Sequence, residues 1–118
     1  MPIDKSVIAM LREFQEEGKP DFIQELFELF VTLTPTMLTR MEKGLETKDF
    51  QTVFRNAHTL KSQAGNLGAK RLGILCAELE GLARDAKPSL DLMIPLMDTI
   101  RKEYEEAERE LRALFPSA

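Results

Sequence analysis

Hydrophobic residues recur along this chain every three or four positions, the spacing that places them on one side of an α-helix. No segment shows the strict apolar–polar alternation that is typical of a half-buried β-strand. The pattern therefore predicts an all-α fold. Short connections between the helical segments favour an antiparallel four-helix bundle, with an additional short N-terminal helix packed across one end. We expect the whole chain, residues 1–118, to form this single domain.

The boundaries of the first two helices follow from a capping residue, a glycine and two prolines. The first, short helix is expected to begin at Asp4 and to end at Gly18. Pro20 suits the first turn of the second helix. We expect this helix to continue through Pro35 as one long kinked helix, and a short break at Pro35 is the alternative. Its exit is expected over residues 44–48.

The remaining three helices have similar start and stop signals. Asp49 is a candidate N-cap for the third helix, which should end in a turn where Gly68 suits a positive φ. The fourth helix is expected over about residues 69–86, and Ser89 is a candidate cap for the last one. The apolar stripe of that last helix is expected to comprise Leu92, Leu96, Ile100, Tyr104, Ala107, Leu111 and Leu114.

The only histidine, His58, lies in the third helix on the side opposite its apolar stripe. Helical spacing puts Lys61, Ser62 and Gly65 on the same face, together with Arg55 one turn earlier. A neutral imidazole has one ring nitrogen with a free lone pair, so it can act as a nucleophile and carry a phosphoryl group. The two basic side chains would offset the charge of that group, and the two small residues leave room for another protein. An ordinary exposed surface histidine is the alternative.

The charge pattern sets the surroundings of this histidine apart from the rest of the chain. The protein is acidic, with 20 Asp and Glu residues against 16 Lys and Arg residues. None of the acids falls within residues 50–77, where composition alone would place about five. The same stretch contains Arg55, Lys61, Lys70 and Arg71. Such a basic, acid-free zone suits an anionic ligand or an acidic partner surface.

The segment His58-Thr59-Leu60-Lys61, followed by residues 64–69 (AGNLGA), resembles the signature of histidine phosphotransfer (HPt) domains. The similarity extends to residues 75–80 downstream and to residues 20–22 upstream, so in outline it covers nearly the whole chain. This resemblance implies a phosphorelay module of two-component signalling, with His58 as the phosphoacceptor and Lys61 as the phosphate-stabilising cation. The implied partners are receiver domains of response regulators and of hybrid sensor histidine kinases. The resemblance implies a phosphoryl carrier rather than an enzyme.

The sequence departs from the family pattern at a few positions. Many members have Gly where Ser62 stands, and several have Gln where Glu80 stands. A carboxylate at this second position could hold one ring N–H of the histidine, or it could repel the phosphoryl group. The resemblance also implies docking near the first helices, so Met10 or Phe14 is expected to remain exposed beside the histidine as a docking patch. Packing of this first helix on the bundle alone is the alternative.

Composition excludes several other classes of protein. No apolar run approaches 18 residues, so we expect no membrane span, and the N-terminus lacks a signal-peptide layout. A single cysteine, Cys76, is expected in the core and favours a reducing compartment, the cytoplasm. The net charge of −4 and the pI near 5.1 argue against nucleic acid as a partner. Nothing in the composition requires a dimer, so a monomer is expected.

We expect no cofactor in this chain. One His and one Cys argue against a zinc site. Any Mg²⁺ should belong to the acidic site of the receiver domain, because the acid-free zone offers no carboxylates to hold it. Two other functions stay open beside phosphotransfer. The first is a helical adaptor that binds a partner through the same basic face without phosphorylation. The second is an enzyme with His58 as a general base, although an exposed helix face supplies no pocket for it.

Overall fold

The computed structural model describes residues 3–14 and 22–114, which fold into five helices and contain no strand. The helices are α1 (Lys5–Phe14), α2 (Phe22–Thr47), α3 (Phe50–Asn66), α4 (Lys70–Ala83) and α5 (Leu90–Leu114). The predicted all-α class is thereby confirmed for the described part of the chain. None of these helices is both long enough and apolar enough to cross a membrane.

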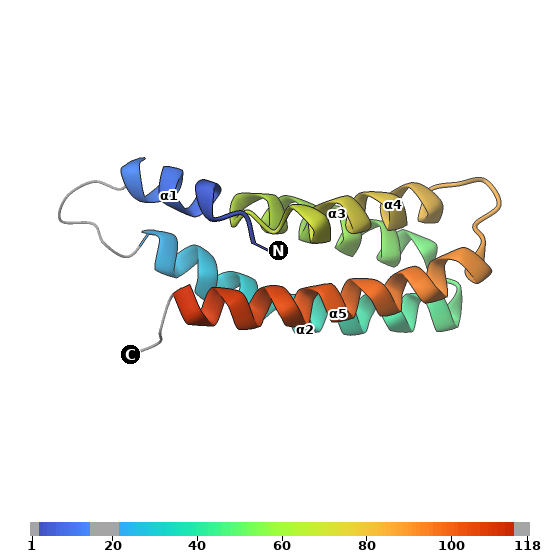
Figure 1. The fold of residues 1–118 in the computed structure, drawn as a ribbon. Helices are drawn as coiled ribbons and strands as arrows, with labels where there is room; N and C mark the ends of the chain where they lie inside the picture. The colour runs from blue at the N-terminus through green and yellow to red at the C-terminus, as the bar shows by residue number, and fades with distance from the viewer. Residues whose placement is uncertain (1–2, 15–21, 115–118) are drawn as a thin grey trace.

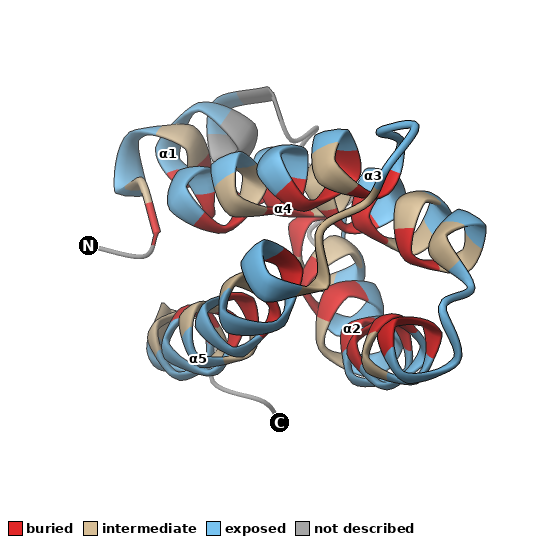
Figure 2. Cartoon of the chain, turned by 90° about the vertical axis from the view of Figure 1, so that its right-hand side faces the viewer, coloured by how far each residue is buried: buried red, intermediate tan, exposed pale blue. Residues whose placement is uncertain are grey.

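The four longer helices form an antiparallel bundle, and the molecule as a whole is elongated, with extents of 50 × 23 × 21 Å. In Figure 1, α3 and α4 form the upper layer and α2 and α5 form the lower layer. Along the chain α2 packs against α3, α3 against α4 and α4 against α5, and α5 closes the bundle by packing against α2. The view along the bundle in Figure 2 shows the buried residues of all four helices facing one shared core.

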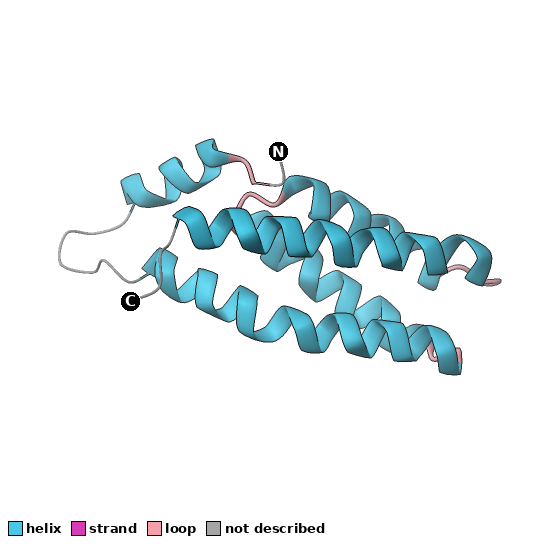
Figure 3. Ribbon diagram, turned by 60° about the horizontal axis from the view of Figure 1, so that its bottom comes forward, coloured by secondary structure: helices cyan, strands magenta, loops and turns pink. Residues whose placement is uncertain are grey.

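The short helix α1 lies at one end of the bundle, beside the turn between α3 and α4 (Figures 1 and 3). The Asp4 carboxylate caps it by accepting a hydrogen bond of 2.9 Å from the backbone N–H of Ser6. The backbone N–H of Asp4 donates to the carbonyl of Gly68 at 2.7 Å. Gly68 has a φ of 77°, as predicted, and a Cβ there would lie 2.7 Å from the Asp4 carbonyl oxygen. A glycine is therefore what lets α1 pack on this turn. The expected helix end at Gly18 lies outside the described residues.

Helix α2 is one continuous helix through Pro35, as predicted, and the expected start at Pro20 lies outside the described residues. The predicted exit over residues 44–48 begins too early. Gly44 is buried inside the helix, where a Cβ would approach the Val53 side chain to 2.8 Å. This glycine serves the close packing of α2 against α3, and the chain turns only at Lys48, which has a φ of 57°.

The caps and ends of the other helices largely follow the predictions. Asp49 caps α3, accepting a hydrogen bond of 3.2 Å from the backbone N–H of Thr52. Helix α4 ends at Ala83 rather than near residue 86, because its last turn tightens into shorter-range backbone hydrogen bonds. Ser89 precedes α5, and its carbonyl accepts the first backbone hydrogen bonds of that helix.

The predicted stripe of α5 is correct from Leu96 onward, because Leu96 and Leu114 pack partly buried against the core, and it is wrong at Leu92. Leu92 is 58% exposed and Leu96 is half-buried, whereas Met93 and Met97 are buried. The buried positions alternate steps of four and three residues, the spacing that keeps a seam facing its partner helices in a bundle. Both candidate pairs are apolar, so hydrophobicity alone did not distinguish them.

Candidate functional site

The packing of α3 turns His58 toward solvent. Residues on the opposite side of this helix are fully buried: Val53, Ala57, Leu60 and Ala64. The His58 side chain is 58% exposed. One turn earlier, the ring of Phe54 stacks on the imidazole with 6.2 Å between ring centroids and 19° between planes. The imidazole is therefore accessible to solvent, and the stacked Phe54 ring limits the orientations that it can take.

A single carboxylate from α4 contacts both His58 and Lys61. Glu80 Oε2 lies 2.8 Å from His58 Nδ1, and Glu80 Oε1 accepts a hydrogen bond of 2.7 Å from Lys61 Nζ. The Glu80 side chain is only 10% exposed. The hydrogen bond from Lys61, followed by that from His58, lowers the pKa of Glu80, although partial burial opposes the shift. Glu80 is therefore an ionised carboxylate at neutral pH.

This contact determines which nitrogen of His58 carries a proton. An ionised carboxylate can only accept hydrogen bonds, so the proton between the two groups belongs to Nδ1. The lone pair of the neutral imidazole then lies on Nε2. Within the described chain, Nε2 takes part in no hydrogen bond. The site thus presents a nucleophilic nitrogen on an exposed ring that is held from its other side.

Residues 50–77 contain no acid in the sequence, but the prediction of a basic, acid-free zone is wrong for the folded protein, where acids from other segments lie beside them. Three of its four basic side chains are paired with acids from other segments. The pairs are Lys61–Glu80 at 2.7 Å, Lys70–Asp4 at 2.5 Å and Arg71–Glu103 at 3.6 Å. Arg55 is exposed, and its side chain forms no hydrogen bond or ion pair with another described residue. Helix packing brings acids to the zone that sequence spacing does not show, so its positive charge is largely neutralised.

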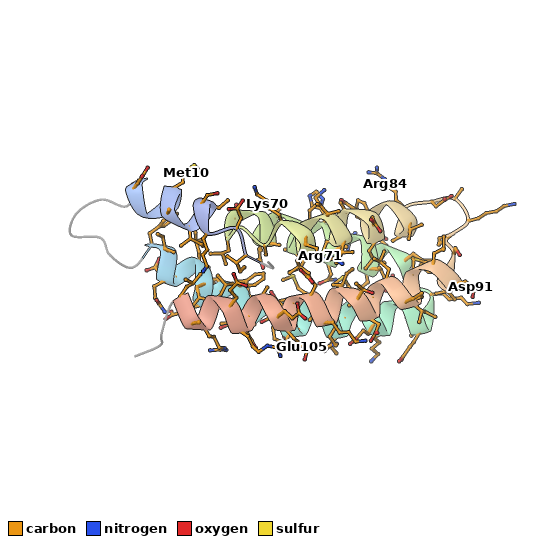
Figure 4. All side chains as sticks on the ribbon, in the orientation of Figure 1. Met10, Lys70, Arg71, Arg84, Asp91 and Glu105 are labelled. Carbon is orange, nitrogen blue, oxygen red and sulfur yellow. The ribbon has the colours of Figure 1, made fainter. Side chains whose placement is uncertain are left out.

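The small residues beside the imidazole leave the surface open. Ser62 is exposed and its hydroxyl donates a hydrogen bond of 3.4 Å to the His58 carbonyl. A Cβ added to Gly65 would meet nothing within 4 Å. Met10 is 49% exposed, but Figure 4 shows it on α1 beyond Lys70, whereas Glu80 lies one turn before Arg84 at the other end of α4. The structure therefore does not bring Met10 to the imidazole, and the side chain of Phe14 lies outside the described residues.

Two residues of the site, Phe54 and Arg84, were not predicted from the sequence. The guanidinium of Arg84 lies 5.6 Å from the centroid of the Phe54 ring, which in turn stacks on His58. Figure 4 shows Arg84 projecting from the upper layer, away from the bundle. Helical spacing could have found both residues, because Phe54 is four positions before His58 and Arg84 is four positions after Glu80.

Other chemistry has little support in the described residues. They include no group of three or more His, Cys, Asp or Glu side chains that could hold a metal ion. Cys76 is buried, as predicted, and burial raises the pKa of its thiol to about 12. This thiol stays protonated at neutral pH and is not an activated nucleophile.

Most of the chain matches a known protein family. The family model described as the Hpt domain matches residues 25–110. The chain belongs to the Hpt domain family. It is similar to histidine-containing phosphotransfer protein 2 of Arabidopsis thaliana, with 28% identity over 108 residues. That alignment covers 89% of this chain and 68% of the plant protein.

Two solved structures share the fold of this chain. Histidine-containing phosphotransfer protein B of Pseudomonas aeruginosa is 27% identical, with a TM-score of 0.81 over 95% of this chain and 92% of that chain. Ypd1 of Saccharomyces cerevisiae superposes with a TM-score of 0.84 over 99% of this chain and 96% of that chain. Ypd1 was crystallised with the receiver domain of its downstream response regulator Ssk1. At 17% identity this second likeness concerns the fold alone.

Proposed function

We propose that this Hpt-domain protein carries a phosphoryl group on Nε2 of His58, taking it from an aspartyl phosphate of one receiver domain and giving it to another. The observation that carries the proposal is the 2.8 Å contact between His58 Nδ1 and Glu80, which leaves a lone pair on an exposed Nε2. The proposed partners are receiver domains of response regulators and hybrid sensor kinases. The co-crystal of the structurally similar Ypd1 with a receiver domain supports this assignment.

The transfer step needs few groups from this chain. The Nε2 lone pair attacks phosphorus, and the bond from phosphorus to the aspartate oxygen breaks with its electrons returning to the receiver carboxylate. Lys61 Nζ can turn from Glu80 toward the phosphoryl oxygens, since its side chain is 36% exposed. In this proposal any Mg²⁺ belongs to the receiver's acidic site. The chain acts as a carrier in the cytoplasm and has no turnover of its own.

The apolar surface of α2 supports a docking site different from the one that the sequence suggested. Phe22, Leu29 and Leu33 are large apolar residues that are 53%, 53% and 43% exposed. A shallow pocket between α2 and α3 is lined by Leu29 together with Gln63 and Asn66, which flank the open positions beside the histidine. We propose that a receiver docks over this α2–α3 edge, with its phosphoryl group above His58.

The experiment that tests the proposal is phosphoryl transfer from a panel of phosphorylated receiver domains to the wild-type protein and to His58→Gln. We expect an acid-labile, base-stable phosphoryl group on the wild type and none on the variant, with both proteins showing the same helical circular dichroism. Receiver binding should persist in the variant, because the glutamine removes only the nucleophile. If no receiver transfers its phosphoryl group while the variant still binds its partners, the protein is an adaptor and the proposal is wrong.

A further inference from the structure

We propose that Glu80 makes phospho-His58 a short-lived, fast-discharging form of the carrier. The carboxylate keeps a proton on Nδ1 of the phosphorylated ring and places a negative charge beside the phosphoryl group. This inference rests on the proposed carrier function, and it concerns the lifetime of the phosphoryl group on the protein.

The position of Glu80 is what gives it this effect. Its side chain is 10% exposed and its two oxygens are already engaged by His58 Nδ1 and Lys61 Nζ. Water therefore reaches the carboxylate poorly and screens its charge less than it would at an exposed position. A glutamine would fill the same volume and accept the same hydrogen bond from Nδ1, but it would carry no charge.

The proton on Nδ1 decides how readily the phosphoryl group leaves. When Nε2 attacks phosphorus, the ring already carries the Nδ1 proton and becomes a phosphorylated imidazolium. In solution that proton can be lost, giving a neutral phosphoimidazole. Here the carboxylate of Glu80 accepts the hydrogen bond from Nδ1 and favours the protonated ring. In the next step the bond between Nε2 and phosphorus breaks, its electron pair returns to Nε2, and a neutral imidazole is the leaving group.

Once His58 is phosphorylated, two anions attract the Lys61 side chain: the Glu80 carboxylate and the phosphoryl group. In the unphosphorylated protein its Nζ lies 2.7 Å from Glu80 Oε1. A phosphoryl group on the same face attracts this cation, and Glu80 then loses its strongest compensating partner. The charged groups around the ring are Lys61 and Arg55 on α3, and Glu80 and Arg84 on α4. Of these four groups only Glu80 is negative, so its charge is the one that disfavours keeping the phosphoryl group on His58.

The test compares the lifetime of phospho-His58 in three proteins: the wild type, Glu80→Gln and Glu78→Gln. Each is phosphorylated with phosphoramidate, freed of the donor, and followed by phosphorus NMR between roughly pH 6 and pH 9. Glu78→Gln is the matched control. Glu78 is exposed on the same helix and faces the α4–α5 side, and its substitution changes the net charge by the same amount as Glu80→Gln. We expect Glu80→Gln to lose its phosphoryl group roughly tenfold more slowly than the wild type, the factor that corresponds to a change of one unit in the proton affinity of Nδ1. Glu78→Gln should match the wild type.

The pH profile separates this role from a structural one. In the wild type, fast loss of the phosphoryl group should extend to higher pH than in Glu80→Gln, because the Glu80 carboxylate keeps the proton on Nδ1. Lys61→Gln is the second variant, and it should shorten the lifetime because it leaves Glu80 uncompensated. Equal lifetimes and equal pH profiles in the wild type and Glu80→Gln, or a longer lifetime in Lys61→Gln, would overturn the inference and leave the carrier function standing. Failure of the wild type to become phosphorylated by phosphoramidate or by any receiver would overturn both.

Discussion

Two glycines three positions apart should respond in opposite ways to the same substitution. Gly65 lies in the exposed face of α3, and a Cβ there would meet nothing within 4 Å. Alanine should therefore add helix propensity without a clash and stabilise the fold by about 0.5–1 kcal/mol. Gly68 has a φ of 77°, and a Cβ there would lie 2.7 Å from the Asp4 carbonyl oxygen and 3.1 Å from Val7 Cβ.

The cost at Gly68 has two parts. An L-residue in the left-handed region costs about 1–2 kcal/mol. The clash with the start of α1 adds about 1–3 kcal/mol, because backbone atoms must move to relieve it. We expect Gly68→Ala to lower the free energy of unfolding by about 2–5 kcal/mol in total. The two alanine variants should then differ by about 2.5–6 kcal/mol, the sum of the cost at Gly68 and the gain at Gly65.

Urea unfolding followed by circular dichroism measures this difference directly, with the midpoint and the slope fitted separately for each variant. An unchanged slope would show that only the stability of the native state has moved. If the two alanine variants agreed within about 0.5 kcal/mol, the size expected of an ordinary surface substitution, the assigned roles of the two glycines would be wrong. Destabilisation by Gly65→Ala would likewise contradict the open surroundings of that residue.

Three further predictions concern ionisable groups. Lys61→Met should slow phosphoryl transfer about tenfold, the loss of one charge-assisted hydrogen bond to the phosphoryl group, whereas Lys43→Met on α2 should transfer at the wild-type rate in the same assay. The thiol of Cys76, with its pKa raised to about 12 by burial, should react with a thiol reagent only in proportion to the unfolded fraction, measured across a urea series. Asp4 has a pKa lowered from 3.8 to about 2, mainly by its hydrogen bond with Lys70, so the stability it contributes is complete above pH 3.8 and is lost as the pH falls through 2. A carboxyl NMR titration should show that low midpoint, and Lys70→Met should move it up toward 3.8; an unmoved midpoint would contradict the pair.

The sequence predicted those parts of the fold that depend on local chemistry. Asp49 caps α3 and Gly68 takes a positive φ, because capping and left-handed turns depend on a residue and its immediate neighbours. The outward position of His58 followed from the apolar stripe on its own helix. The start of α5 could not be settled in this way, since Leu92 and Met93 are both apolar and only packing against the other helices decides which one is buried.

The parts of the site that come from different helices were harder to predict. Glu80 lies 22 positions after His58, and their contact depends on the register between α3 and α4, which no single-helix pattern specifies. For the same reason, the stretch of residues 50–77 looks basic in the sequence, although Asp4 just before α1 and acids from α4 and α5 neutralise most of its charge. The family resemblance drew attention to Glu80, but the structure supplies its second partner, Lys61.

The most direct test of the account is to determine which atom carries the phosphoryl group. Uniformly ¹⁵N-labelled protein is phosphorylated by a receiver domain, and phosphorus–nitrogen correlation identifies the ring nitrogen bonded to phosphorus. Because Glu80 holds Nδ1 at 2.8 Å, the account predicts phosphorus on Nε2 of His58 and a retained proton on Nδ1. Phosphorus on Nδ1, or on any residue other than His58, would contradict it.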